Sequence, residues 1–166
     1  MLPRLIIRSS SIHAAGCYTT QPIRKGRRVV EYGGQRLSKD LADKRYANRD
    51  ITYLFTIDGT TDVIDGFGTA MFLNHSCKPN CQTVGVGKGK KERIFIVALR
   101  NIAAGEELVY EYNLCDSDED DLEDTAACYC GAPKCRGTMY SDEELKRRAK
   151  HARKKERSDA KKKAHR

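Results

Sequence analysis

The 166-residue sequence lacks any long hydrophobic run. No apolar segment approaches the roughly 20 residues that a membrane-spanning helix requires. The apolar trio at residues 5–7 is too short for the core of a secretory signal peptide. These absences predict an intracellular protein with no membrane contact. The length is that of one domain with a core of its own.

Complete disulfide pairing is also excluded, because the chain has seven cysteines, an odd number. Without a secretion signal, a reducing compartment and a metal site explain these cysteines better than a disulfide framework does. The spacing of the cysteines then decides which of them are candidate metal ligands.

Excess positive charge is nearly absent from most of the sequence. Residues 141–166 carry twelve Lys and Arg against five Asp and Glu, and so hold +7 of the net charge of +8.

Ser141 and Glu144 fit a capping box, which predicts a helix start there. Beyond Leu145 few positions are apolar, so we expect a solvated helix or a disordered tail. The acidic run at residues 116–124 either attracts a basic peptide or forms a solvated loop.

Short segments of strand composition dominate the rest of the chain. We expect strands over residues 5–7, 28–32, 52–57, 61–65, 84–86, 94–99 and 107–112. Ser38 is placed to cap one helix over about residues 39–48. Many strands and few helical segments predict a mainly β fold.

The segment from Phe72 to Cys81 suits neither a regular strand nor a helix. Its Asn and Ser side chains favour bonds to nearby backbone, and Pro79 fixes φ, so the segment predicts a shaped loop. It follows an apolar run at residues 70–73, so polar and thiol groups there need partners. These residues alone equally fit a satisfied turn with a buried cysteine.

Two further blocks carry chemistry. Residues 106–113 alternate so that Leu108, Tyr110 and Tyr112 share one face of a strand, which also fits an ordinary strand core. Residues 128–137 contain Cys128, Cys130 and Cys135. Three thiols leave a tetrahedral zinc ion one ligand short, so the fourth ligand must come from elsewhere.

With these three blocks in this order, residues 5–140 resemble the SET-domain protein lysine methyltransferases with a post-SET zinc segment. The resemblance implies small curved β-sheets, short helices, a threaded C-terminal strand and a zinc knot. It places a SET domain at 1–115, an acidic linker at 116–127, the post-SET zinc segment at 128–140 and a basic helical or disordered tail at 141–166. Neither a pre-SET cysteine cluster nor a reader domain is visible, so targeting must come from the tail, a partner or the substrate.

The resemblance also implies the site residues. It assigns Cys77 as the fourth zinc ligand, beside the three cysteines of residues 128–137. It assigns S-adenosylmethionine binding to His13, Ala15, Gly16, Tyr53, Asn74, His75 and Tyr129. It assigns the catalytic site to Tyr112, Tyr110 and Tyr53.

The N-terminal turn, Tyr129 and the remaining cysteines leave alternatives open. The family has a Gly-x-Gly turn, and Ala14 replaces its first Gly, although Ala takes positive φ only at a cost. By itself the turn around Gly16 fits an ordinary hairpin. Tyr129 also fits an exposed ring on a small zinc knot. Cys17, Cys81 and Cys115 remain as buried or free thiols.

Methyl transfer to lysine explains why phenols are suited to this site. The amine must lose a proton, although its ordinary pKa is about 10.4. A dry aromatic channel disfavours the ammonium form, and in-line positioning supplies further acceleration. The Tyr112 hydroxyl is expected beside the transferred methyl group, where the hydroxyl oxygen makes weak contacts with the methyl hydrogens. A water held by Tyr110 would occupy the room for further methyl groups, so we expect mainly monomethyl-lysine.

The sequence therefore predicts an S-adenosylmethionine-dependent protein lysine N-methyltransferase acting on histone-like or other basic proteins. The alternative is a catalytically weak SET-like module that binds chromatin or nucleic acid through its basic tail. The tail also fits a solubility segment or a site of self-methylation. The expected location is the nucleus and chromosome in a eukaryote, or the cytoplasm and nucleoid in a bacterium. The sequence indicates no oligomeric state.

Overall fold

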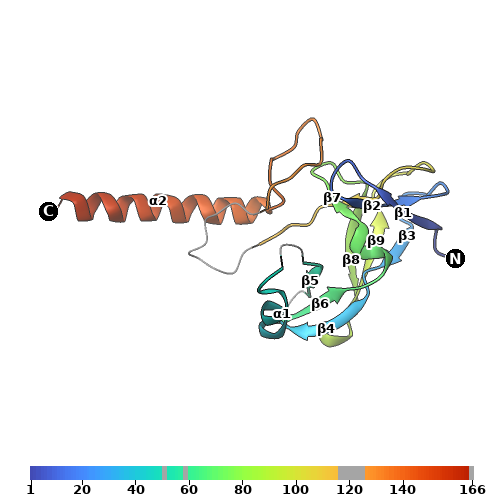
Figure 1. Cartoon of the computed structure of the whole chain (residues 1–166), viewed down its shortest axis with the longest axis horizontal. Coiled ribbons are helices and arrows are strands. Elements are labelled where there is room, and N and C mark those ends of the chain that lie inside the picture. The colour runs from blue at the N-terminus through green and yellow to red at the C-terminus, as the bar shows by residue number, and fades with distance from the viewer. Residues whose placement is uncertain (50–51, 58–59, 116–125, 165–166) are drawn as a thin grey trace.

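Three small β-sheets form the body of the protein, and one long helix projects from it (Figure 1). The computed structural model describes residues 1–49, 52–57, 60–115 and 126–164. The first sheet is an antiparallel pair, β1 (Leu5–Ser9) with β2 (Ala15–Thr19). The third sheet has the order β4 (Gly34–Ser38), β6 (Asp62–Gly66), β5 (Leu54–Thr56).

The second sheet has five strands in the order β3-β9-β8-β10-β7. Their bounds are β3 Arg28–Glu31, β7 Asn74–His75, β8 Cys81–Val86, β9 Arg93–Ala98 and β10 Val109–Tyr110. Two short 3-10 helices interrupt the strands, η1 (Thr69–Phe72) and η2 (Gly89–Lys91). The mainly β architecture predicted from the sequence is therefore confirmed.

The last strand is threaded beneath a loop, as expected. Strand β10 lies between β7 and β8 and runs parallel to both. Residues 76–80 join β7 to β8 and so pass across β10. Within this loop the Asn80 side chain donates to the Glu107 carbonyl at 2.7 Å and accepts from the Val109 N–H at 2.9 Å. One amide thus fixes the backbone of the strand that it crosses.

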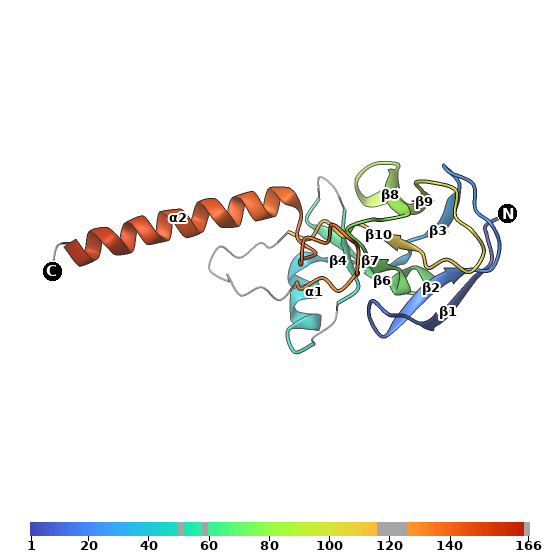
Figure 2. The same cartoon turned by 90° about the horizontal axis from the view of Figure 1, so that it is seen from above.

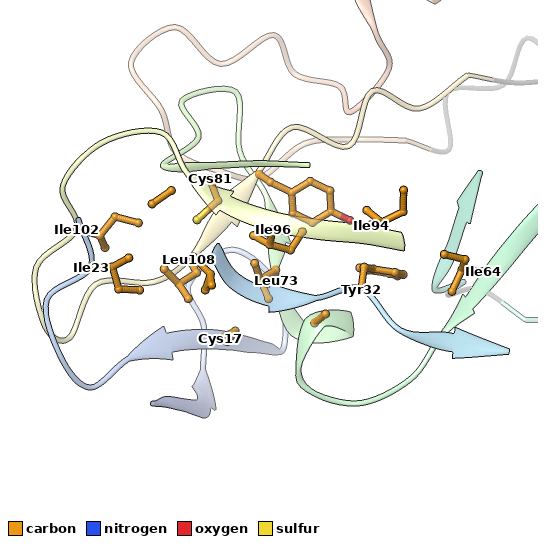
Figure 3. Packing of buried hydrophobic residues seen from close by; sticks show 14 of the residues in the cluster. Cys17, Ile23, Tyr32, Ile64, Leu73, Cys81, Ile94, Ile96, Ile102 and Leu108 are labelled. Atoms are coloured by element: carbon orange, nitrogen blue, oxygen red, sulfur yellow. The ribbon is translucent and has the colours of Figure 1, made fainter. Parts of the chain in front are cut away.

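The core lies where the sheets meet, and Figure 3 shows its side chains. Apolar residues from β2, β3, β8, β9 and the segment before β10 pack together there. The largest fully buried members include Ile57, Leu73, Ile96, Ile102 and Leu108. A smaller cluster of Leu37, Ala42 and Val63 supports α1 (Lys39–Tyr46). As predicted, Ser38 caps this helix by accepting the Leu41 N–H.

Helix α2 (Asp142–Ala164) extends away from the body in both views (Figures 1 and 2). Its first turn realises half of the predicted capping box, because the Ser141 hydroxyl accepts the Glu144 N–H at 3.1 Å. The Glu144 carboxylate turns instead to Arg147 and Arg148, at 2.7 and 2.9 Å. Among the described residues, no helix combines the length and apolar character needed to cross a membrane.

Some expectations about elements need correction. The strand predicted over residues 107–112 is only Val109–Tyr110. Its flanking backbone groups bond instead to β2 and to two side chains, Asn80 and His75, of residues 72–81, which form the central loop. Strand β4 was not anticipated, since its polar residues lack the composition of a strand. The acidic residues 116–124 lie outside the described residues. The boundaries at 115, 127 and 140 therefore stay predictions.

Candidate active site and metal centre

Four cysteine thiols converge at the junction of the body and the C-terminal segment. The sulfur atoms of Cys77, Cys128, Cys130 and Cys135 all lie within 4.8 Å of one another. The Cys77 Sγ is 3.8 Å from that of Cys128 and 4.0 Å from that of Cys135. A tetrahedral zinc ion with Zn–S bonds of about 2.3 Å would separate its sulfurs by about 3.8 Å. The four thiols therefore fit zinc, and they are the four that the resemblance implied.

The backbone around the thiols is shaped to hold them. Gly131 and Gly137 take positive φ values of 65° and 77°, which non-glycine residues adopt only at a cost. Backbone N–H groups point at sulfur, with Gly137 donating to Cys135 Sγ at 3.3 Å and Cys77 to Cys130 Sγ at 3.5 Å. Although burial opposes it, N–H donation from Ala132 and Cys77 lowers the pKa of Cys130 to about 6. Such thiolates are the form that binds metal.

His75 connects this metal centre to the tyrosine strand. Its Nδ1 accepts the backbone N–H of Tyr112 at 3.2 Å, and its Nε2 lies 3.4 Å from Cys77 Sγ. Burial lowers the His75 pKa, against the opposing charge of Glu111. A neutral ring that accepts at Nδ1 carries its proton on Nε2, where it can donate to the sulfur. The imidazole of His75 thus contacts both the candidate zinc ligand Cys77 and the backbone of Tyr112.

Two phenols lie side by side next to His75. The ring centroids of Tyr110 and Tyr112 are 4.9 Å apart, and those of Tyr112 and His75 are 5.4 Å apart in a T-shaped arrangement. The Tyr112 hydroxyl donates to the Leu73 carbonyl at 2.8 Å. Burial raises the pKa of both phenols, so both stay neutral. Because its proton is used by Leu73, the Tyr112 oxygen is left to act as an acceptor.

The sequence reasoning missed Tyr32, which belongs to the same group of phenols. Its hydroxyl donates to the Tyr53 carbonyl at 2.9 Å, and it contributes to raising the pKa of Tyr110. A Cβ on Gly66 would lie 2.6 Å from the Tyr32 hydroxyl and 2.8 Å from the Tyr53 carbonyl. The available signal was a buried strand that ends in Tyr32 and two glycines, a place where backbone approaches closely.

The predicted cofactor residues divide into two groups. Asn74 is buried, and its Nδ2 donates to the Ala15 carbonyl at 3.0 Å. The central loop therefore touches the N-terminal turn, residues 11–16. Gly16 is buried beside them. His13 is exposed, and the Tyr129 side chain is 72% exposed. The structure brings the first group together and leaves the second exposed, and the cofactor roles of both groups stay predictions.

The turn before Gly16 carries the departure noted from the sequence. Ala14 has φ +33°, in the region that favours glycine. Its carbonyl accepts the Ser10 N–H at 3.2 Å, which closes the turn. The replacement of glycine by alanine therefore stores backbone strain next to the candidate cofactor site.

The remaining cysteines lie outside the metal centre, as expected. Cys17 and Cys81 are buried in the core (Figure 3). Burial raises the pKa of each to about 12, so both remain neutral thiols. Cys115 is exposed.

Comparison with known proteins agrees with this architecture. Residues 14–113 match the SET domain family model, more than half of the chain. The chain therefore belongs to the SET domain family.

Among curated proteins, the chain is similar to two fungal proteins named histone-lysine N-methyltransferase, H3 lysine-4 specific. The Eremothecium gossypii protein is 42% identical over 138 residues, covering 78% of this chain and 14% of the relative. The Saccharomyces cerevisiae protein is also 42% identical over 138 residues, covering 78% of this chain and 12% of the relative. The Arabidopsis thaliana histone-lysine N-methyltransferase ATX2 is 39% identical over 155 residues, covering 88% and 14%. The chain thus spans about one seventh of these relatives.

Proposed function

We propose that this SET-domain chain is an S-adenosylmethionine-dependent protein lysine N-methyltransferase with a basic protein substrate. The observation that carries the proposal is a convergence of groups from distant segments. The Tyr112 phenol, the Asn74 amide and the four thiols, Cys77 among them, come together next to the paired short strands β7 and β10. Relatives named for histone H3 lysine 4 make histone H3 the first substrate to test.

The N-terminal turn and the central loop would hold the cofactor. S-adenosylmethionine, when bound, supplies an electrophilic methyl group on its sulfonium. Ala15, Gly16, Asn74 and the His75 backbone would line one side of this site, and the contact between Asn74 and Ala15 supports this assignment. His13 and Tyr129 are exposed and would fold over the bound molecule from the two neighbouring loops.

The phenols would line the lysine channel. Tyr53, Tyr110 and Tyr112 would surround the position where the substrate amine meets the methyl group. Buried rings disfavour the ammonium form, which lowers the amine pKa and leaves a lone pair for in-line attack. The Tyr112 hydroxyl donates its hydrogen bond to the Leu73 carbonyl. Its oxygen can therefore accept weak C–H contacts from the methyl group.

The zinc centre would act as a clamp. Cys77 belongs to the central loop, whereas the other three ligands come from residues 128–135. A bound Zn²⁺ would therefore tie the C-terminal segment against the loop that carries Asn74 and His75. His75 passes the same restraint to the backbone of Tyr112.

A labelled-methyl transfer assay tests this function. Zinc-loaded protein is incubated with labelled S-adenosylmethionine and histone H3 or mixed basic proteins. Wild type is expected to label lysine, and Tyr112→Phe to lose roughly 100-fold or more of the rate, as for loss of a positioned transition-state group. Tyr140→Phe, which also loses one phenol hydroxyl but lies outside the channel, is expected to keep the rate. Wild type that labels none of these proteins would refute the proposal.

Product state is a finer part of the proposal. Tyr110 is 7% exposed and lies against Tyr112, where its hydroxyl can hold a water in the space for a second methyl. Mainly monomethyl-lysine is expected from wild type, and higher methylation from Tyr110→Phe. Mass spectrometry of the modified peptide measures both. Mostly trimethyl-lysine from wild type would contradict this assignment.

The second candidate function is chromatin or nucleic-acid binding through the basic tail. The favouring observation is that α2 projects from the body while residues 141–166 carry +7 (Figure 2). Binding of the whole chain to labelled duplex DNA, measured by anisotropy at several salt concentrations, tests this. Binding that weakens steeply with salt supports phosphate contacts. DNA binding without methyl transfer would favour the binding module over the enzyme.

A further inference from the structure

The Glu107 carboxylate lies between the N-terminal turn and the central loop. It accepts from the Ser10 hydroxyl at 2.8 and 3.0 Å, and from the Tyr18 hydroxyl at 3.0 Å. It also accepts from Asn74 Nδ2 at 2.8 Å. Three donors from three segments thus meet on one carboxylate. None of the three donors is a cation, so the contacts orient neutral groups rather than neutralise charge.

Close packing keeps this carboxylate in place. A Cβ built on Gly16 would lie 2.2 Å from Glu107 Oε1, so only glycine leaves room for it. The Glu107 carbonyl is held by Asn80 Nδ2 at 2.7 Å, and the next N–H, from Leu108, donates to the Cys17 carbonyl at 2.7 Å. Backbone and side chain are therefore both fixed before any ligand binds.

The contacts of Glu107 decide how the Asn74 amide is oriented. A primary amide has two N–H donors and one carbonyl acceptor. Both donors of Asn74 are used, one by the Ala15 carbonyl at 3.0 Å and one by Glu107 at 2.8 Å. In the described part of the chain, no group donates to Asn74 Oδ1. A ligand at this site therefore meets an acceptor, and only a ligand donor matches it.

We infer that Glu107 is a positioning residue that fixes the Asn74 amide with its oxygen toward the cofactor's amino-acid end. This inference rests on the proposed function, because it concerns the same S-adenosylmethionine site. The ammonium of that end is the donor that a buried amide oxygen would recognise, since the neighbouring carboxylate of the cofactor can only accept. Glu107 itself acts only through Asn74.

Two ligands separate this role from a general structural one. S-adenosylhomocysteine carries the ammonium, whereas 5′-methylthioadenosine shares the adenosine and thioether but lacks the amino-acid end. Affinities of both are measured by calorimetry on the zinc-loaded full chain. Glu107→Gln is expected to bind S-adenosylhomocysteine about tenfold more weakly, the effect of one lost charge-assisted hydrogen bond, and methylthioadenosine equally well.

Glu106→Gln is the matched control, since it neutralises the adjacent carboxylate, which pairs with Arg100 on the exposed side. It is expected to change neither affinity. If Glu107→Gln does not fold, Ser10→Ala/Tyr18→Phe releases the same carboxylate and should give a smaller loss that is again confined to S-adenosylhomocysteine. An equal loss for both ligands, or no loss, overturns the role of Glu107. Wild type that binds neither ligand overturns the proposed function itself.

Discussion

The body and the C-terminal extension, residues 126–164, are held by different kinds of interaction. The body buries a continuous apolar cluster that runs through its sheets (Figure 3). In the described extension, the buried apolar side chains are only Ala126 and Tyr140. Thiols and ion pairs hold it instead, with Arg136 bridging to Glu111 at 3.2 Å. Removing a metal ion or neutralising an ion pair would therefore loosen the extension while the apolar core of the body stays intact.

The candidate active site lies on the seam between these two regions. Cys77 and Tyr112 belong to the body, while three ligands and Tyr129 belong to the extension. The wall of the site that the body forms is therefore held by the apolar core. The second wall, formed by the extension, depends on metal and ion pairs. A substitution can therefore weaken either the body or the extension while leaving the other region intact.

The largest effect is expected from Cys135→Ser, which removes one of four zinc ligands. Bound zinc should fall from one ion per chain to almost none, and methyl transfer by at least about 100-fold. Hydrogen exchange should accelerate over residues 126–140 but stay slow in β8 and β9. Elemental analysis and exchange mass spectrometry measure these changes.

Cys115→Ser is the matched control, because Cys115 is exposed and outside the metal centre. It should retain zinc and activity. Equally fast exchange in β8 and β9 of the Cys135 variant would show that body and extension are not separable.

Asn80→Ala should cause the next largest effect, this time in the body. It leaves the Glu107 carbonyl and the Val109 N–H without their partner. One buried and one part-buried backbone group without partners should lower the free energy of unfolding by about 2–4 kcal/mol. Urea unfolding measures this, with Asn101→Ala, whose side chain accepts from Lys25 in an exposed turn, as the milder control. A loss as small as that of the control would mean that threading does not depend on this amide.

Glu144→Gln tests the charge that stabilises the first turns of α2, where Glu144 pairs with Arg147 and Arg148 of the same helix. Hydrogen bonds from Arg147, and then from Arg148, hold the pKa of Glu144 below its ordinary value. Its contribution is therefore fully present above the ordinary Glu pKa of about 4.3 and is lost as the pH falls through the lowered pKa. At pH 7 the variant should lose about 1 kcal/mol of local stability, and exchange should accelerate in the first turn of α2.

Glu143→Gln, an exposed carboxylate in the same turn, is the control for Glu144. The difference between wild type and Glu144→Gln should shrink as the solution is acidified. A difference that does not shrink on acidification would show that the ion pair is not its source.

The smallest effect is expected from Ala14→Gly, in the turn with positive φ. Glycine relieves the strain of φ +33° but loses more entropy on folding, so a net gain of about 0.5 kcal/mol is expected. Thermal unfolding measures it. Ala15→Gly, at the start of β2, relieves no such strain and should destabilise. A loss for both variants would mean that the turn is unstrained.

The sequence predicted the parts of this molecule that depend on local pattern. The strand periods, the cap at Ser38 and the unusual loop before Cys81 follow from neighbouring residues. The thiol cluster was predicted as three residues plus a distant fourth, and only the family resemblance named Cys77. The structure brings these four sulfurs together, as that resemblance implied.

What escaped prediction depends on contacts between distant segments. Glu107 reads as an ordinary charged residue at a strand start, but threading places its half-buried carboxylate against Ser10, Tyr18 and Asn74. Tyr32 reads as a strand core residue, and only the fold places it beside Tyr53. The shortening of β10 has the same cause, since its flanking groups bond across the chain rather than along a ladder.

The most direct test compares methyl transfer to histone H3 before and after metal removal from the same protein. The account predicts transfer by the zinc-loaded chain, almost none after chelation, and recovery when zinc is restored. No transfer by the zinc-loaded chain would contradict the enzyme assignment. Equal transfer by the metal-free chain would contradict the claim that the second wall of the site depends on its four thiols.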